Sequence, residues 1–425
     1  MRVEIAGGGI TGLALHYFLE RQGVDSTVRE VANRPGGVVE SDCVEGRVID
    51  FGPQRTRLTP AIEDVVDALG IRDRLLRAPD LPLFVYHAGA LRRVPRTIRG
   101  AITTDLLSWR GKFRALLEPA RGLPQAGETV EEYLTRAFGR EVARRLGGPL
   151  YAGLYASDPD DMPVEHSLAT ALDRFGVTRS VLKTALRSRL HRRDPPPVVS
   201  FEEGMEALPR AIYRRHRDSV RLGDPIVELR PSQDGWRVLS ESSDRFADAV
   251  VLTTPAYASA EILEGVDGES ARALASLTYN PLAVVHLRAD TDLDAAGYQV
   301  SLDADLVTRG VTYNDSLFGR DGVYTCYLGG ATRQAVVEWA PDRLGRKAAR
   351  EFETVTGCPA RVLSVRRFPR AMPAYDTSWD ALEAVSTPDG VHLCASYESR
   401  AGIPGRIRAA KRLAARLAGE SDVDR

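Results

Sequence analysis

The sequence predicts an α/β fold in which the strands of one parallel sheet come from distant parts of the chain. Three observations support this prediction. An apolar run at 3–6 precedes a glycine-rich turn and a helical pattern, a second apolar run spans 247–255, and a third spans 390–397 before the last helical pattern. Such continuous apolar runs are typical of parallel strands that are covered on both faces.

The first of these segments has the spacing of a Rossmann-type dinucleotide-binding unit. The turn Gly7-Gly8-Gly9-Ile10-Thr11-Gly12 follows the strand and begins a helix that Gly23 ends. Gly7 permits the tight turn, Gly9 lets the backbone approach a pyrophosphate, and Gly12 lets the helix pack on the strand. The helix N-terminus, which includes Ile10 and Thr11, offers N–H groups and a partial positive charge to the phosphates.

A second strand follows at 26–31 and carries the acid that this pattern requires. Glu30 stands 18 residues after Gly12, next to Val31, and is expected to accept hydrogen bonds from ribose hydroxyls. The segment Arg34-Pro35-Gly36-Gly37 then places a guanidinium and two side-chain-free N–H groups beside the same phosphates. We therefore include Val31, Arg34, Gly36 and Gly37 among the expected cofactor-binding residues.

This extension resembles the FAD proteins of the amine oxidase and protoporphyrinogen oxidase class. In that class the acid is followed by Arg-x-Gly-Gly and later by an acid-x-Gly-Pro turn, which Asp50-Phe51-Gly52-Pro53 matches. NAD enzymes lack the extension, so the resemblance implies FAD, bound at Gly52 and Pro53 among others. Because no cysteine or histidine falls in a covalent attachment motif, the FAD is expected to be noncovalent.

The resemblance also implies that insertions interrupt the nucleotide domain and that its later strands return downstream. Within 220–229, Ile226 or Val227 is expected to contact the adenine through backbone groups. The strand at 247–255 is expected to end against the cofactor at Thr253 and Thr254. The last strand ends at Ala395 and Ser396, where the family has glycine and Asp or Asn, and the helix that follows begins at Gly402-Ile403-Pro404. In the family this helix points its N-terminus at the flavin.

The expected organisation is a discontinuous Rossmann-type FAD-binding domain with an inserted α+β substrate domain. The FAD-binding domain comprises 1–60, 198–262 and 384–425. The helical part of the substrate domain spans 61–197, and its antiparallel sheet part spans 263–383.

Five further segments resemble the protoporphyrinogen and coproporphyrinogen oxidases in the right order along the chain. They span 69–95, 129–139, 149–159, 308–330 and 368–375. The resemblance implies an oxygen-dependent FAD oxidase of heme biosynthesis that aromatises protoporphyrinogen IX or coproporphyrinogen III to the porphyrin. Hydride would pass to flavin N5, which carries the chemistry, and dioxygen would reoxidise the flavin with release of H2O2. No residue is identified as a catalytic acid or base.

A tetrapyrrole is flat and apolar with ionised propionates at one edge, so its site requires an apolar slot with cations at the mouth. The eukaryotic members of the family carry an arginine where this chain has Leu83, so the propionates need other partners. The candidates for the mouth are Arg57, Arg92, Arg93 and Arg96. The candidates for the walls are Leu154, Tyr155, Phe318, Leu328 and Met372.

Composition limits the partners and the location. The chain has 57 Lys and Arg residues against 58 Asp and Glu residues, which argues against nucleic acid as a partner. The basic stretches 92–121 and 179–193 suit propionates or anionic headgroups, so peripheral membrane contact is left open. No apolar run is long enough to span a bilayer, and a strand pattern occupies the position of a signal peptide, so the expected location is cytoplasmic. The cysteines and histidines lie far apart in sequence, so no metal is expected.

Two alternatives stay open at this point. The chain could be an FAD-dependent amine oxidase or a carotenoid-desaturase-like oxidoreductase. It could also be an inactive FAD-bound protein with a structural or partner-binding role.

Overall fold

The computed structural model describes residues 1–188, 195–399 and 402–419, apart from the side chains of residues 154, 170, 174, 188 and 399. The chain divides into two compact units. The first unit comprises Met1–Ala78, Pro196–Leu277 and Asp380–Arg425, and the second unit comprises Pro79–Pro195 and Thr278–Trp379. The three segments expected to bind FAD all fall within the first unit.

The first unit also includes four stretches that the sequence assigned to the substrate domain, two long ones, 61–78 and 263–277, and two short ones, 196–197 and 380–383. Helix α2 (Pro60–Ala68) buries Ile62, Val65 and Val66 in the core of the first unit. Helix α12 (Gly268–Ala275) packs on α11 (Ala256–Leu263), which follows a strand of the central sheet. The observed boundaries differ from the expected ones near residues 60 and 262, because these helices bury their apolar faces against the first unit. That burial depends on tertiary packing and is not visible in the local sequence.

The core of the first unit is a five-stranded sheet in the order β10-β2-β1-β14-β20, in which every pair is parallel. The strands are β10 (Val220–Leu222), β2 (Asp25–Glu30), β1 (Arg2–Ala6), β14 (Ala249–Leu252) and β20 (Val391–Leu393). Val3, Ile5, Val28 and Val251 are all fully buried, as expected for strands covered on both faces. The structure therefore confirms the predicted α/β class.

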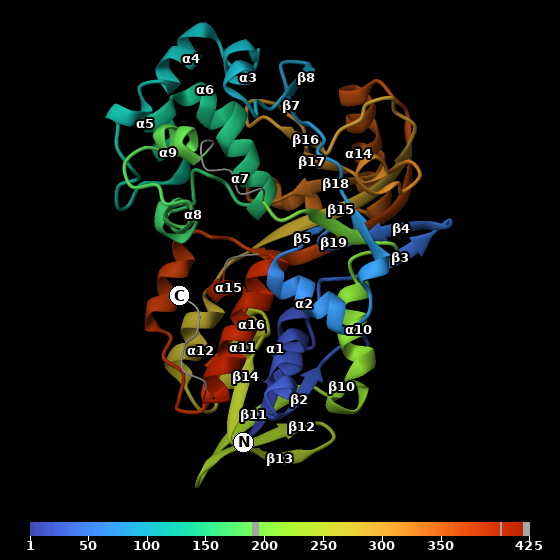
Figure 1. Cartoon of the computed structure of the whole chain (residues 1–425), viewed down its shortest axis with the longest axis vertical. Helices are drawn as coiled ribbons and strands as arrows, with labels where there is room; N and C mark the ends of the chain where they lie inside the picture. The colour runs from blue at the N-terminus through green and yellow to red at the C-terminus, as the bar shows by residue number, and fades with distance from the viewer. Residues whose placement is uncertain (189–194, 400–401, 420–425) are drawn as a thin grey trace. The chain divides into compact units, whose positions relative to one another are not determined.

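Helices pack together beside this sheet. Helix α1 (Ile10–Arg21) contacts both α16 (Ile403–Leu417) and α10 (Ala207–Arg215), and α16 contacts α2 (Figure 1). All residues of α1 from Ile10 to Leu19 are buried, so α1 lies inside the unit and not at its surface.

Antiparallel strands complete the first unit. A three-stranded sheet, β11 (Ile226–Ser232), β12 (Gly235–Ser240) and β13 (Asp244–Ala247), contacts β1 and β14 of the central sheet. A hairpin is formed by β3 (Ser41–Val44) and β4 (Arg47–Asp50). A third small sheet has the order β5 (Thr56–Arg57), β9 (Val198–Phe201) and β6 (Leu75–Arg77).

The second unit is built on a seven-stranded sheet whose pairs are antiparallel except for β16 with β7. Helix α14 (Pro341–Thr356) packs on four of its strands. In sheet order the strands are β19 (Ala360–Pro373), β15 (Tyr279–Ala289), β18 (Val323–Gly329), β17 (Thr308–Tyr313), β16 (Gly297–Val300), β7 (Leu83–His87) and β8 (Ala90–Arg93). Both insertions therefore contribute to one sheet, because β7 and β8 come from the earlier one.

The remaining helices of the second unit lie mostly between β8 and the end of the first insertion. Helix α5 begins with a capping box in which Thr129 and Glu132 each bond the other's backbone N–H. The helices are α3 (Ile98–Thr103), α4 (Trp109–Ala115), α5 (Val130–Phe138), α6 (Arg140–Val142), α7 (Gly148–Tyr155), α8 (Leu168–Arg174), α9 (Val181–Ser188) and, after β17, α13 (Asn314–Phe318). None of the helices among the described residues has both the length and the apolar character needed to cross a membrane.

Candidate functional site

The glycine turn between β1 and α1 is packed as the spacing predicted. A Cβ on Gly12 would lie 2.0 Å from the carbonyl oxygen of Gly7, so no larger residue fits there. From the end of β14, the Thr253 hydroxyl donates to the carbonyl oxygens of Ala6, at 2.8 Å, and Gly7, at 3.0 Å. The Thr253 side chain therefore holds the turn in place by binding the backbone of the turn.

The N-terminus of α1 is open for an anion. Gly9 is its N-cap, with extended backbone, and no described side chain caps the helix. Its first turn contains no acidic residue. The N–H groups there and the dipole of the helix favour a phosphate.

The second glycine loop lies directly against the first. Gly36 N donates to Gly8 O at 2.8 Å, and a Cβ on Gly9 would meet Gly37 Cα at 4.0 Å. Arg34, whose side chain is partly exposed, donates from Nη2 to Gly37 O and to Glu40 Oε2, each at 2.7 Å. The guanidinium thus fastens its own loop, and the two glycine backbones form a narrow cradle.

Glu30 ends β2 with a buried carboxylate that contacts the glycine turn. Its Oε2 accepts from Gly8 N at 2.6 Å, and its Oε1 accepts from Ala32 N at 2.9 Å. An ionised carboxylate has about four acceptor positions. Glu30 can therefore accept ribose hydroxyls while it keeps both backbone bonds.

Two exposed valines lie on segments that meet beside Glu30. Asp224 N donates to Glu30 O at 3.0 Å, and this bond joins the end of β2 to the loop before β11. Val31 is 72% exposed and Val227 is 52% exposed, whereas Ile226 is buried. A bulge in β11 between Ile226 and Glu228 accounts for the outward position of Val227. Apolar side chains open to solvent at this position suit the face of an adenine ring.

A buried ionic network, which the sequence reasoning missed, supports this end of the sheet. Arg29 donates to Glu4 Oε2 at 2.7 Å and also binds Asp224. Its remaining donors reach the hydroxyls of Ser240, at 2.9 Å, and Ser243, at 2.8 Å. The available signal was the place of Arg29 inside a predicted strand of the parallel sheet, next to Val28.

Asp224 is held ionised within that network. Burial by itself would raise the pKa of Asp224, but hydrogen bonds from Ser242 and Ser240 and the charge of Arg29 outweigh burial and lower it. The loop that carries Asp224 is therefore fixed by charge as well as by its backbone bond to Glu30.

The Asp50-Phe51-Gly52-Pro53 turn is tied to a segment far away in sequence. Asp50 is buried, and its Oδ1 accepts from Ser41 Oγ at 2.5 Å and from Met205 N at 2.8 Å. Gly52 packs so closely that a Cβ would lie 1.9 Å from Val38 O. Gly52 and Pro53 are half-buried and lie at the surface of this turn.

The last predicted cofactor contacts lie where β14 and β20 end. Thr254 Oγ1 lies 2.8 Å from Ser259 Oγ, which also accepts from the Tyr397 hydroxyl at 2.9 Å. Tyr397 belongs to the short helix α15 (Ser396–Ser399) that follows β20. Ala395 is buried and Ser396 half-buried. Helix α16 begins after Gly402, with Ile403 buried and Pro404 half-buried in its first turn, and no described side chain caps it.

The predicted cofactor residues thus all belong to the first unit, and most lie at the carboxyl ends of β1, β2, β14 and β20. Ligands of open α/β sheets bind at this edge. The glycine cradle, the uncapped α1 and the Glu30 carboxylate fit a dinucleotide such as FAD. Their roles as contacts stay predictions.

In the second unit, three of the segments singled out from sequence meet. Ala331 N donates to Ala156 O at 2.8 Å, and Ser157 Oγ donates to Ala374 O. Asn280 Nδ2 donates to Ser157 Oγ at 2.9 Å. Ala156 and Tyr375 have left-handed backbone, with φ of 52° and 54°. Left-handed backbone at non-glycine residues is strained and gathers at functional sites.

A row of aromatic rings runs through this junction. The ring centroid of Tyr155 lies 5.7 Å from that of Tyr151 and 4.7 Å from that of Tyr375. The ring centroid of Tyr375 lies 4.4 Å from that of Trp379. From this row, which we call the aromatic row, only Tyr155 was a wall candidate, although Tyr151 and Tyr375 also lie in segments singled out from sequence. The row itself could not be predicted, because it joins residues of both insertions.

The other wall candidates do not gather at one place. Met372 lies opposite Asn280 in the β15–β19 pairing and is therefore close to the junction. Leu328 is fully buried in the sheet core. Phe318 is at the opposite end of β18, with the Arg320 guanidinium 5.5 Å from its ring. The side chain of Leu154 lies outside the described residues.

The structure does not assemble the four candidate arginines into one group. Arg57 belongs to the first unit, where it donates to Pro196 O at 2.9 Å, whereas the other three belong to the second unit. Arg92 pairs with Asp105 and Arg96 with Asp80, while Arg93 is exposed. A propionate would have to compete with a carboxylate for Arg92 or Arg96.

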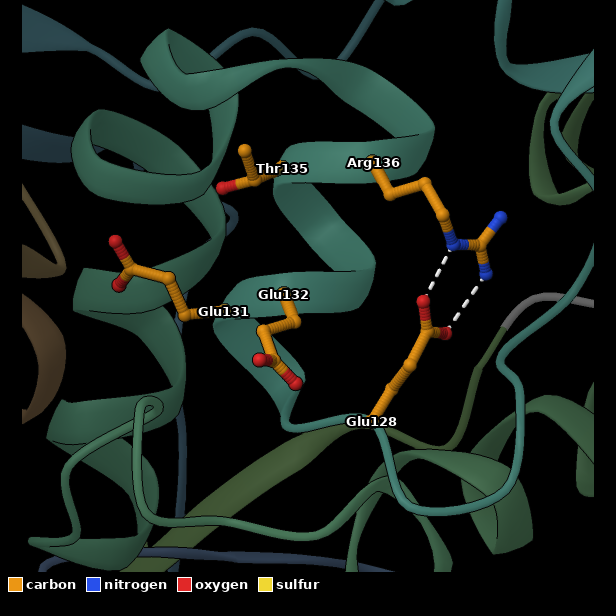
Figure 2. Close-up of a pocket in the computed structure, with 5 residues that line it drawn as sticks. All are labelled: Glu128, Glu131, Glu132, Thr135 and Arg136. Atoms are coloured by element: carbon orange, nitrogen blue, oxygen red, sulfur yellow. Dashed lines mark hydrogen bonds and ion pairs between the residues drawn. The ribbon is translucent and has the colours of Figure 1, made fainter.

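An open pocket beside α5 involves none of the predicted site residues (Figure 2). Its lining is acidic, and its arginine, Arg136, is held by Glu128 at 2.5 and 2.7 Å. Such a lining repels an anionic substrate. The pocket is lined by Glu128, Glu131, Glu132, Thr135 and Arg136.

Comparison with known proteins agrees with this geometry. A Rossmann-type sheet with a glycine cradle, interrupted by a second unit, is typical of proteins that bind a dinucleotide. The model of the flavin-containing amine oxidoreductase family matches residues 10–418. The chain therefore belongs to that family, and it is an FAD-dependent oxidoreductase.

Two relatives and one solved structure illustrate what the chain is similar to. The chain is 28% identical to protoporphyrinogen oxidase 1 of Spinacia oleracea chloroplasts, over 91% of this chain and 78% of that protein. It is 25% identical to coproporphyrinogen III oxidase of Staphylococcus aureus, over 60% of each chain. A solved structure from Exiguobacterium sp. 255-15, provisionally assigned as a protoporphyrinogen oxidase, covers 99% of both chains with a TM-score of 0.82 at 22% identity.

Proposed function

We propose that this chain is an oxygen-dependent oxidase that aromatises a porphyrinogen in heme biosynthesis. The substrate is protoporphyrinogen IX or coproporphyrinogen III, and the products are the porphyrin and H2O2. Aromatisation removes six electrons, so three molecules of dioxygen are each reduced to H2O2. Bound FAD supplies the acceptor for each hydride at N5.

The observation that carries this proposal is the aromatic row at the junction in the second unit. The row joins segments 149–159 and 368–375, which resemble those of the porphyrinogen oxidases in sequence. Stacked or tilted rings offer a flat apolar substrate a large contact area with little loss of side-chain entropy. The named relatives support the same substrate class.

The residues of this chain then act by binding, orienting and excluding water. Tyr155, which is half-buried, would contact the macrocycle, and the buried Tyr375 would support the Tyr155 ring from behind. Orientation of the reacting carbon is the main contribution that the protein makes to such a transfer.

Anaerobic reduction of the yellow holoprotein tests the proposal. The flavin absorbance is followed in stopped flow after mixing with coproporphyrinogen III, protoporphyrinogen IX or putrescine. Rapid bleaching by a porphyrinogen is expected. Bleaching by the amine alone would establish an amine oxidase, and no bleaching by any donor would establish an inactive flavoprotein.

Two substitutions localise the substrate. Tyr155→Ala and Tyr375→Ala should slow bleaching by the porphyrinogen at least about tenfold, because the first removes the contacting ring and the second removes the ring that supports it. Phe175→Ala serves as the control, because Phe175 belongs to the same unit and its side chain is 72% exposed. Equal rates in all three variants would place the substrate elsewhere.

We further propose that the second unit docks on an anionic membrane surface through α3 and α4. Ile98, Ile102, Trp109, Phe113 and Leu116 are each more than half exposed. The same two helices carry exposed cations, Arg99 and Arg110, and the Lys112 ammonium lies 4.5 Å from the centre of the Trp109 ring. Exposed apolar side chains among cations are typical of surfaces that insert shallowly between anionic headgroups.

A further inference from the structure

A histidine cluster lies along α1 in the first unit, away from the glycine turn. His16 and Glu20 are one helical turn apart on α1, and His216 follows α10. Each of the three side chains offers one ligand atom, and these atoms lie within 4.8 Å of one another. The two imidazole rings are nearly perpendicular, with centroids 4.8 Å apart.

Both imidazoles contain a buried nitrogen that the described residues leave without a partner. His16 is fully buried, and its Nδ1 lies 2.7 Å from Ser26 Oγ. Its Nε2 has no hydrogen-bond partner, and neither does Nε2 of His216. A buried polar atom without a partner destabilises the folded state. Nε2 of His16 therefore calls for a ligand, and His216 offers one ring nitrogen close to it.

We infer that His16, Glu20 and His216 form a binding site for a divalent transition metal of the zinc class. Two imidazoles and one carboxylate are a ligand set that zinc accepts, with water in the fourth position. Ser26 fixes Nδ1 of His16, as an outer-shell partner does in zinc sites, and leaves Nε2 for the metal.

The geometry needs only a small adjustment at the surface. Tetrahedral zinc with bonds near 2.1 Å places its ligand atoms about 3.4 Å apart. The Glu20 side chain is 37% exposed, and its Oε2 lies 3.9 Å from His216 Nδ1. Rotation of this exposed carboxylate closes the site and leaves an entry path for the ion.

The ion would join α1 to α10. His16 lies seven residues beyond Gly9, about 10 Å along the helix axis, so the metal would not touch the phosphate-binding turn. It would instead stabilise the helix that carries this turn. The site is thus independent of the substrate that the enzyme oxidises.

Zinc titration of the FAD-loaded protein, stripped with a chelator beforehand, tests the site. The unchanged protein should bind one Zn2+ per chain in calorimetry and show a higher unfolding temperature with Zn2+ present. Glu20→Gln and His216→Gln should each bind Zn2+ at least about tenfold more weakly and lose the thermal shift. Co2+ should give a visible absorption band beyond the flavin spectrum that both variants lack.

Glu264→Gln is the matched control, because Glu264 is an exposed carboxylate at the end of α11 in the same unit. It should bind Zn2+ like the unchanged protein. Absence of saturable Zn2+ binding, or equal binding by Glu20→Gln, would overturn the inference. Glu20→Gln tests the site even if His216→Gln does not fold, because Glu20 is at the surface. The FAD content of the Glu20→Gln variant shows independently that this variant is folded.

Discussion

Gly9 is the residue at which folding and cofactor binding can be separated. The nearest atom to a Cβ at Gly9 would be Gly37 Cα at 4.0 Å, and the backbone there, with φ −69° and ψ 177°, is ordinary for alanine. We expect Gly9→Ala to unfold at the same urea concentration as the unchanged apoprotein. We also expect it to bind FAD at least about tenfold more weakly, because the methyl group occupies the approach of the pyrophosphate.

Fluorescence titration of the apoprotein with FAD measures that loss. Gly265→Ala is the control, since its Cβ would meet no atom within 4 Å and its φ is not in the left-handed region. A Gly9→Ala protein that retains full FAD affinity would show that the cofactor does not approach the cradle at Gly9.

Arg29 is the residue on which the stability of the first unit should depend most visibly. Its side chain is 2% exposed, its partner Glu4 is fully buried, and its partner Asp224 is largely buried. Arg29→Met should lower the free energy of unfolding by about 3–5 kcal/mol, because it leaves buried carboxylates without a counter-charge. Urea denaturation measures the change.

Arg237→Met is the comparison for that measurement. Arg237 pairs with Asp244 on the exposed face of the β12–β13 hairpin, where water screens the pair. Its removal should leave the midpoint of unfolding almost unchanged. If both variants lose the same free energy of unfolding, the buried ion pairs of Arg29 contribute no more to stability than the exposed pair of Arg237.

At the scale of elements, α4 is where membrane docking can be tested. Trp109 and Phe113 are 75% and 70% exposed, one helical turn apart on α4. Replacing both with serine should weaken binding to phosphatidylserine-containing vesicles at least about tenfold, since burial of each ring stabilises binding by about 1.5–3 kcal/mol. Co-sedimentation at low and high salt measures the binding, which should fall as salt rises.

Phe246→Ser, in β13 of the first unit, is the control for docking, because Phe246 is also an exposed aromatic residue. It should bind vesicles like the unchanged protein. If the α4 double variant also binds unchanged, the apolar residues of α4 are not the docking surface.

Helices and strands could be predicted from sequence where the residues that identify them lie close together along the chain. The strand β1, the glycine turn, α1 and the acid of β2 follow one another within thirty residues, and the spacing alone predicted them. The pairing of β7 with β16 was not predictable, because it joins strands of the two different insertions. Nothing near Leu83 in the sequence indicates its partner strand.

At the scale of the whole molecule, some candidate site residues could be found from local sequence spacing and others could not. The glycines and Glu30 could be found because a dinucleotide requires them at fixed spacing. The aromatic row and the cluster of His16 with His216 could not, because tertiary packing brings their members together. The sequence predicted no metal from histidine spacing, and spacing along the chain does not report distance in space.

The strand order β10-β2-β1-β14-β20 has a consequence for biosynthesis. The phosphate-binding turn leaves the ribosome long before its neighbours β14 and α16, which begin at residues 249 and 403. Until then, β1 has no partner strand on one side, and the face of α1 that α16 covers is exposed. Synthesis must therefore pass α16 before the flavin can be retained, and chains that stop earlier expose apolar surface to which chaperones bind.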